Sequence, residues 1–213
     1  SYLGLVFIAI GLQKPGIALL LLFAHGLARA LQFMGVGSII ATTNCQDLTE
    51  LGGIGTRMPA TLLAFVIGGA GVTGLLPLGC FWCFGLMLNT LLPDHPLLAG
   101  VYLLTNALTC ANVIRVLRSV FAGAPLPKTR RTPECNWLMA LPMVSLTMLV
   151  LLLPLIMQRI DPVPGITAFS STTGLVVLAS GAAGVILGVL LPQQQFRSRS
   201  RYPVVRVFQD LLA

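Results

Sequence analysis

The chain has 213 residues, of which 56% are hydrophobic and only 9% are charged, and its formal net charge is +7. A soluble domain carries about 25% charged residues, so the composition excludes a soluble domain and indicates an integral membrane protein in contact with the lipid bilayer. The positive charge does not indicate nucleic-acid binding, because most basic residues gather in short polar segments between or after the apolar ones.

The order of apolar segments predicts an all-α membrane protein, built as a transmembrane helix bundle with one broken helix. We expect a partial span at residues 1–12 and complete spans at 16–41, 59–91, 97–121, 137–157 and 166–191. Residues 192–213 are expected to form a basic tail that leads into a further element. The start within a span, without an initiator Met, leads us to expect a segment of a longer chain.

Two ionisable residues, His25 and Arg29, lie four positions apart in the apolar span 16–41, which places them on one face of a helix. An arginine at the centre of a membrane costs about 3 kcal/mol or more unless it meets partners or water. The spacing therefore indicates a polar path, and we expect both side chains to line one cavity near the midplane. The alternative is that they only hydrogen-bond to neighbouring helices.

The apolar stretch 59–91 is longer than the roughly 20 residues that one straight crossing needs. Pro77 lies in its middle, flanked by Gly74 and Gly79. Proline removes a backbone donor and clashes with the preceding turn, so we predict a helix that is broken near residues 74–79. Such a break survives in a membrane only where protein or a water-filled cavity satisfies the freed backbone groups. An ordinary proline kink is the alternative.

The five cysteines are odd in number and scattered, which favours packing roles over disulfides. Cys80 and Cys83 form one Cys-x-x-Cys motif, but no second pair completes a metal site. The Gly-Gly-Ile-Gly segment 52–55 indicates a loop and lacks the pattern of a phosphate loop. We therefore expect no metal and no cofactor in this chain.

The remaining charges predict an orientation. Arg115 and Arg118 lie near the end of the span 97–121, where Arg115 is a possible buried charge and Arg118 is expected to reach the headgroups. Alternating spans place the segments 42–58 and 123–136 and the tail on one side. That side holds eight basic residues and the other only Lys14 and Arg159, so the positive-inside rule predicts that it is cytoplasmic. In the last span, Ser180, Gly184 and Gly188 form a small-residue ridge suited to close helix packing.

Several stretches together resemble a known family. They are residues 1–4 (Ser-Tyr-Leu-Gly), 24–38 (Ala-His-Gly-Leu-Ala-Arg-Ala-Leu-Gln-Phe-Met-Gly-Val-Gly-Ser), 47–53, 57–59 (Arg-Met-Pro) and 74–82 (Gly-Leu-Leu-Pro-Leu-Gly-Cys-Phe-Trp), with Arg115. In order and spacing they resemble the antiporter-like large subunits of respiratory complex I and its photosynthetic NDH-1 relatives, which are also similar to Mrp-type sodium/proton antiporters. The resemblance covers about the first 120 residues.

The chain departs from this family at several positions that bear on proton transfer. Arg29 stands where the family has a lysine, four residues after the histidine that His25 matches. In the broken helix Phe81 and Trp82 match, but Phe84 stands at the family's lysine, and a glycine and a leucine stand at the two acids that follow it. A buried lysine can release a proton, whereas arginine stays charged and phenylalanine carries no proton. We therefore expect Phe84, with Phe81 and Trp82, to plug the family's proton exit.

These replacements, with residues 125–131 and 142–145, resemble the NdhF-type variants of the CO2-uptake NDH-1 complexes of cyanobacteria. The resemblance implies a non-catalytic membrane-arm subunit in the thylakoid, within a complex that reduces plastoquinone with electrons from ferredoxin or NAD(P)H. It implies other NDH-1 membrane-arm subunits and a CO2-hydration protein as partners. Proton movement coupled to electron transfer would then support CO2 hydration by that docked protein.

Two alternatives remain open. The first is an ordinary proton-pumping NDH-1 subunit, against which Phe84 argues, because such a pump is expected to keep a titratable group in the broken helix. The second is a stand-alone cation/proton antiporter or an inert membrane scaffold. No Asp or Glu lies in the apolar core of any expected span, which leaves a transported cation without a carboxylate ligand.

Overall fold

The computed structural model describes residues 2–46, 48, 50–126, 129–130, 132–160 and 171–191. Within these residues all regular structure is helical, which confirms the all-α fold class. The helices are α1 (Tyr2–Gly11), α2 (Pro15–Thr43), α3 (Pro59–Val72), α4 (Gly79–Asp94), α5 (Pro96–Phe121), α6 (Trp137–Ile160) and α7 (Ser171–Leu190). The expected basic tail 192–213 and the start of the span expected from residue 166 lie outside the described residues.

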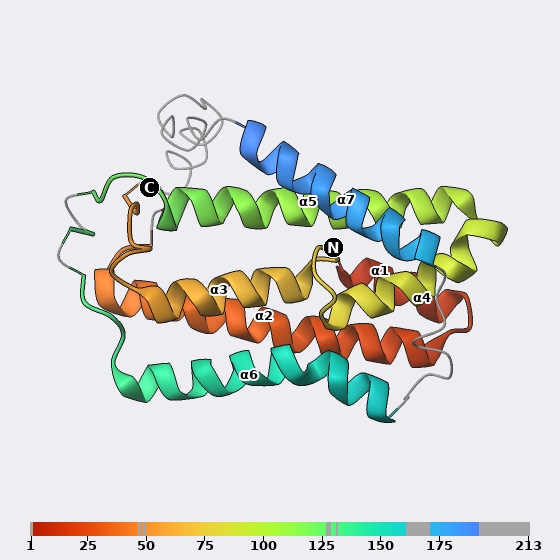
Figure 1. Ribbon diagram of the computed structural model, residues 1–213, viewed down its shortest axis with the longest axis horizontal. Coiled ribbons are helices and arrows are strands. Elements are labelled where there is room, and N and C mark those ends of the chain that lie inside the picture. Colours follow the sequence, from red (N-terminus) through yellow and green to blue (C-terminus); the bar gives the residue numbers. More distant parts are fainter. Residues whose placement is uncertain are drawn as a thin grey trace, which may run out of the picture.

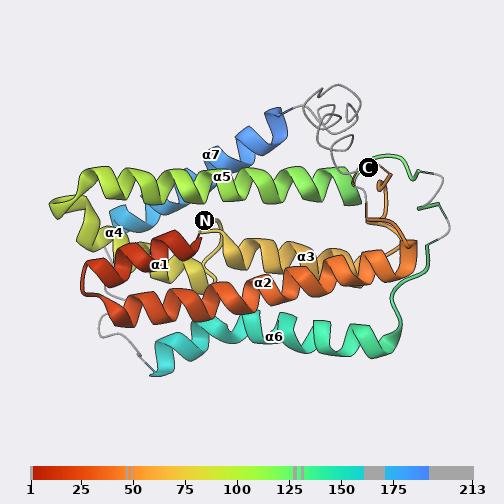
Figure 2. The ribbon, with the colours of Figure 1, turned by 180° about the vertical axis from the view of Figure 1, so that it is seen from behind.

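The longest helices lie side by side along one axis of the molecule (Figure 1). Four helices, α2, α5, α6 and α7, are long and apolar enough to cross a membrane. Helix α4 continues beyond the end of α3 in the same direction after a short interruption (Figure 1), and α1 lies between α5 and α2 in Figure 2. The segments 44–58 and 122–136 meet at one end of the bundle, while the α1–α2 turn and the α4–α5 junction lie at the other (Figure 1).

The Gly-Gly-Ile-Gly segment closes the end of α5. The backbone N–H groups of Gly53, Ile54 and Gly55 donate to the carbonyls of Ala122, Val120 and Phe121 at 3.2, 3.3 and 3.1 Å. These acceptors belong to the last turn of a helix, which has no partners of its own for them. Gly53 has φ +64°, and a Cβ there would lie 2.5 Å from the Pro125 nitrogen, so the turn requires glycine.

A carboxylate closes the start of α3. The Ala60 N–H and the Thr61 hydroxyl donate to the two Glu134 carboxylate oxygens at 3.0 and 2.9 Å. An anion is favourable at the positive end of a helix dipole, and it satisfies an N–H that has no partner within the helix. The Thr61 hydroxyl also pairs with the Ser38 hydroxyl at 3.1 Å, so Glu134 ties the segment before α6 to both α2 and α3.

The small-residue ridge of α7 packs on α5, which confirms the role expected from the sequence. A Cβ on Gly188 would lie 2.7 Å from the Ala111 carbonyl oxygen, and one on Gly184 would collide with the Ala107 carbonyl oxygen. Arg118, expected at the headgroups, donates to the carbonyls of Gly188 and Val189 in the last turn of α7. The backbones of α5 and α7 therefore lie in direct contact along the ridge. Arg118 joins the two helices at the C-terminal end of α7.

We predict that Gly184→Leu separates α7 from α5, because the new side chain has no space beside the α5 backbone. Overpacking of this kind costs about 1–3 kcal/mol. The matched control is Gly100→Leu on α5, where nothing lies within 4 Å of the Cβ position. Thermal unfolding of the detergent-solubilised protein should show a Tm lowered by several degrees for Gly184→Leu only. Equal Tm values for the two variants would contradict this packing.

Candidate functional site

The apolar stretch 59–91 is interrupted in its middle. Helix α3 ends at Val72 and α4 begins at Gly79, so residues 73–78 leave the helical path. The Thr73 N–H and hydroxyl both reach the Gly69 carbonyl at 3.1 Å. The indole N–H of Trp82 donates to the Pro77 carbonyl at 3.3 Å. The chain thus has two separate half-helices where an ordinary proline kink was the alternative.

Asn106, a buried residue of α5, bridges this break to α7. Its Oδ1 accepts a hydrogen bond of 2.8 Å from the Gly74 N–H, and its Nδ2 donates to the Ser180 hydroxyl at 2.8 Å. The Ser180 hydroxyl in turn donates to the Val177 carbonyl at 2.7 Å. Asn106 is not among the residues expected from the sequence, although an amide within an apolar span is a signal of a functional position.

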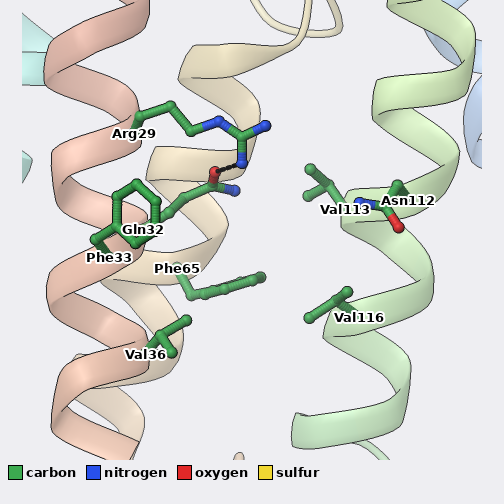
Figure 3. A pocket seen from close by; sticks show the side chains of 8 residues that line it. All are labelled: Arg29, Gln32, Phe33, Val36, Phe65, Asn112, Val113 and Val116. Atoms are coloured by element: carbon green, nitrogen blue, oxygen red, sulfur yellow. Dashed lines mark hydrogen bonds between the residues drawn. The ribbon is translucent and has the colours of Figure 1, made fainter. Parts of the chain in front are cut away.

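Arg29 faces a cavity of about 170 Å³ between α2, α3 and α5. Figure 3 shows its side chain extending from α2 toward this space, with a hydrogen bond of 3.0 Å to the buried Gln32 amide oxygen. The amide of Asn112 on α5 is the third polar group in the lining. The cavity is lined by Arg29, Gln32, Phe33, Val36, Phe65, Asn112, Val113 and Val116.

A second cavity, of about 270 Å³, adjoins the first and shares Val36, Phe65 and Val116 with it. It reaches Leu48 and Leu51 in the segment between α2 and α3. Apolar side chains dominate its lining. The two cavities together run from Arg29, halfway along α2, toward the end of the bundle where the segments 44–58 and 122–136 meet.

His25 does not share the Arg29 cavity, although we expected both side chains in one. Its imidazole stacks on the Tyr2 ring of α1, with centroids 4.5 Å apart and an interplanar angle of 17°. Its buried Nδ1 has no hydrogen-bond partner among the described residues. Arg29 remains close enough to act on His25 electrostatically. The structure therefore places a titratable group and a fixed charge on one helix face but in different surroundings.

Phe84 lies in an aromatic cluster beside the break, where a Cβ built on Gly74 would come within 3.4 Å of its ring. Its ring is 1% exposed and meets Tyr2 and Tyr102 edge-on, each at a centroid distance of 5.5 Å. The Tyr102 hydroxyl donates to the Leu5 carbonyl at 3.1 Å, which joins α5 to α1. Phe84 and Phe81 belong to one buried apolar cluster, and Trp82 packs against that cluster.

The other two rings of the expected plug pair with each other. Phe81 and Trp82 meet edge-on at 6.0 Å, and the Trp82 indole is fixed to the break at Pro77. Arg115 is half-buried on α5 and is absent from the linings of the two cavities described above. Across the described ranges, no three His, Cys, Asp or Glu side chains group so as to hold a metal.

Comparison with known proteins gives a family match. Residues 1–114 match the family described as "NADH:quinone oxidoreductase/Mrp antiporter, TM". The whole chain is 58% identical over 213 residues to NAD(P)H-quinone oxidoreductase subunit 5, organellar chromatophore 2, of Paulinella chromatophora, and spans 34% of that protein's length.

Two further relatives match a shorter part. The chain is 33% identical over 132 residues, 58% of its length, to subunit 5, organellar chromatophore 1, of the same organism, of which 20% is covered. It is 32% identical over 132 residues, again 58% of its length, to the chloroplastic subunit 5 of Nasturtium officinale, of which 18% is covered. The chain therefore resembles one of the two Paulinella proteins along its whole length and the other only in part.

We predict that Asn106→Leu destabilises the break, because the buried Gly74 N–H loses its acceptor. An unsatisfied buried group costs about 1–3 kcal/mol. Asn106→Asp keeps an oxygen for Gly74, and Ser180→Ala removes only the contact to α7, so both should lose less. Trypsin digestion of the solubilised protein, followed by mass spectrometry of cuts near Arg115 and Arg118, reports opening of α5 from α7. Equal protection in Asn106→Leu and the unaltered protein would contradict the bridge.

Proposed function

The chain belongs to the NADH:quinone oxidoreductase/Mrp antiporter transmembrane family, and on that premise we propose that it is part of an NdhF-type subunit 5 of a photosynthetic NDH-1 complex. In this proposal the complex reduces plastoquinone with electrons from ferredoxin or NAD(P)H. The chain itself holds no redox group and moves protons in response to that reaction. Other membrane-arm subunits of NDH-1 are its partners.

The observation that supports proton movement is the position of Arg29. It is the fifteenth residue of the 29-residue helix α2, so its charge lies near the middle of a helix about 43 Å long. A charge at that depth is a functional feature in most membrane proteins. Arginine does not release its proton, so Arg29 acts as a fixed charge that orients water in its cavity and biases the protonation of His25.

The half-helices α3 and α4 support the same proposal. Irregular backbone at membrane depth is tolerated where protein or a water-lined cavity satisfies it, and Asn106 performs this task for Gly74. Broken helices of this kind position ion sites in transporters. We further propose that the bundle end with segments 44–58 and 122–136, which carries Arg57 and Arg130, faces the cytoplasm, and that the membrane is the thylakoid.

The finer proposal is that this subunit belongs to a CO2-uptake form of the complex and docks a CO2-hydration protein. The support is twofold. Phe84 places an apolar ring between Tyr2 and Tyr102. In this proposal the ring excludes water from the route that the family uses for proton exit. In addition, Paulinella has two subunit 5 proteins, and the chain is 58% identical to one and 33% to the other, which is consistent with two specialised forms.

Arg29→Leu tests the proton proposal. In the full-length subunit within its native complex, the variant should lower proton uptake per electron several-fold, because the fixed charge beside His25 is lost, while the complex still assembles. Arg29→Lys keeps a charge and should retain most of the uptake. Proton uptake and plastoquinone reduction are measured together in membrane vesicles. Full uptake by an assembled Arg29→Leu complex would reduce Arg29 to a structural residue.

Phe84→Lys tests the finer proposal. A lysine here adds a group that binds and releases protons, so we expect increased proton flow and weakened CO2 hydration. Phe84→Leu is the matched control, since it keeps the site apolar and should change both quantities little. Co-purification of a CO2-hydration protein with the unaltered complex is the accompanying measurement. If that protein is absent and Phe84→Lys leaves both activities unchanged, the ordinary pump becomes the better assignment.

A further inference from the structure

Tyr2 is a buried polar residue to which the proposed function assigns no role so far. Its side chain is 3% exposed, and it begins α1, the helix that lies between α5 and α2 in Figure 2. One face of its ring stacks on the His25 imidazole at 4.5 Å, and Phe84 meets the ring edge-on at 5.5 Å. Tyr2 therefore contacts both the titratable residue of the site and the apolar ring that closes it.

Two polar atoms at this stack are buried and have no hydrogen-bond partner within the part of the chain that the structure describes. They are the Tyr2 hydroxyl oxygen and His25 Nδ1. Burial of such a group normally costs about 1–3 kcal/mol, and most buried polar groups have a protein or water partner. Their occurrence together, on two stacked rings, indicates a place where a transient partner such as water is bound.

The Tyr2 hydroxyl lies near the Thr109 hydroxyl of α5, which already donates its own proton to the Thr105 carbonyl at 2.7 Å. Thr109 can therefore accept from Tyr2 but has no second proton to give. Three positions before Thr109, on the same face of α5, lies Asn106, which holds the broken helix at Gly74.

The Tyr2 phenol can pass a proton on, whereas the Phe84 phenyl ring cannot. The tyrosine hydroxyl is both a donor and an acceptor, whereas Phe84 offers neither. The face of an aromatic ring within about 6 Å also attracts a cation, and the Tyr2 ring stacks on His25 with centroids 4.5 Å apart. Tyr2 is thus suited both to hold the imidazolium and to accept its proton.

We propose that Tyr2 is a proton-relaying residue, which leads the path from His25 past Phe84 to Thr109 and Asn106 on α5. The inference rests on the proposed movement of protons through His25. In the step, an N–H bond of the His25 imidazolium breaks and its proton passes, directly or through water, to the Tyr2 oxygen. The original phenol O–H bond breaks, and that proton leaves to water beside the Thr109 oxygen. Tyr2 is neutral before and after, and His25 ends neutral.

Tyr2→Phe in the full-length subunit of the native complex tests this proposal. The variant keeps the ring and its stack on His25 but lacks the hydroxyl. We expect a several-fold loss of proton uptake per electron with no loss of thermal stability, because the hydroxyl that is removed has no hydrogen-bond partner among the described residues. Thr109→Val, which removes the acceptor on α5, should give a similar loss of uptake.

Tyr102→Phe is the matched control. It removes a hydroxyl from the other tyrosine that contacts Phe84, but that hydroxyl is bonded to the Leu5 carbonyl. This variant should lower the Tm while each assembled complex retains its proton uptake. Infrared difference spectra of the unaltered complex should also show a tyrosine C–O band that changes together with the histidine bands, and the tyrosine band should be absent from Tyr2→Phe.

His25→Ala separates failure of this inference from failure of the proposed function. Loss of uptake in both His25→Ala and Tyr2→Phe supports the relay. Loss in His25→Ala with full uptake in Tyr2→Phe overturns the relay and leaves the proposed function standing. Loss in Tyr2→Phe alone also overturns it, because Tyr2 would then act by another route. Full uptake in both variants rejects proton movement through His25, and the relay with it.

Discussion

A helix that breaks inside a membrane must find partners for its backbone within the protein, and the rest of this structure depends on how that is done. The Gly74 N–H is satisfied by Asn106, and Asn106 is fixed in turn by Ser180. One amide on α5 therefore joins three parts of the chain, because its oxygen binds the break between α3 and α4 and its nitrogen binds α7. Without water as an alternative partner, this small network determines where α7 can lie.

The close packing of α7 on α5 follows from that bridge. Ser180 is one member of a ridge whose other members, Gly184 and Gly188, press against α5 backbone carbonyls. In lipid there is little hydrophobic gain from helix association, so close approach and polar contacts decide it. The hydrogen bond from Asn106 to Ser180 holds α7 on α5 beside the break. The glycines at 184 and 188 let the two helices approach closely along the rest of the ridge.

The candidate site combines a fixed charge, a titratable group and an apolar ring, each from a different residue. Arg29 gives a fixed charge beside a cavity at mid-depth, and His25 gives a titratable group on the same helix face. Phe84 gives an apolar ring that is buried against two tyrosines. A permanent charge orients water but does not pass a proton on, and an aromatic ring excludes water, so the remaining polar atoms of His25 and Tyr2 decide where a path can continue.

The sequence by itself determined the membrane class, the break near Pro77 and the small face of α7, because hydropathy, proline and glycine act through local geometry. Only the tertiary structure decided which groups meet. It put His25 against Tyr2, although the four-residue spacing to Arg29 suggested one shared cavity, because a common helix face does not fix what each position packs against. It likewise paired Asn106 with Gly74, 32 positions away, a contact that depends on how whole helices pack and that no local pattern encodes.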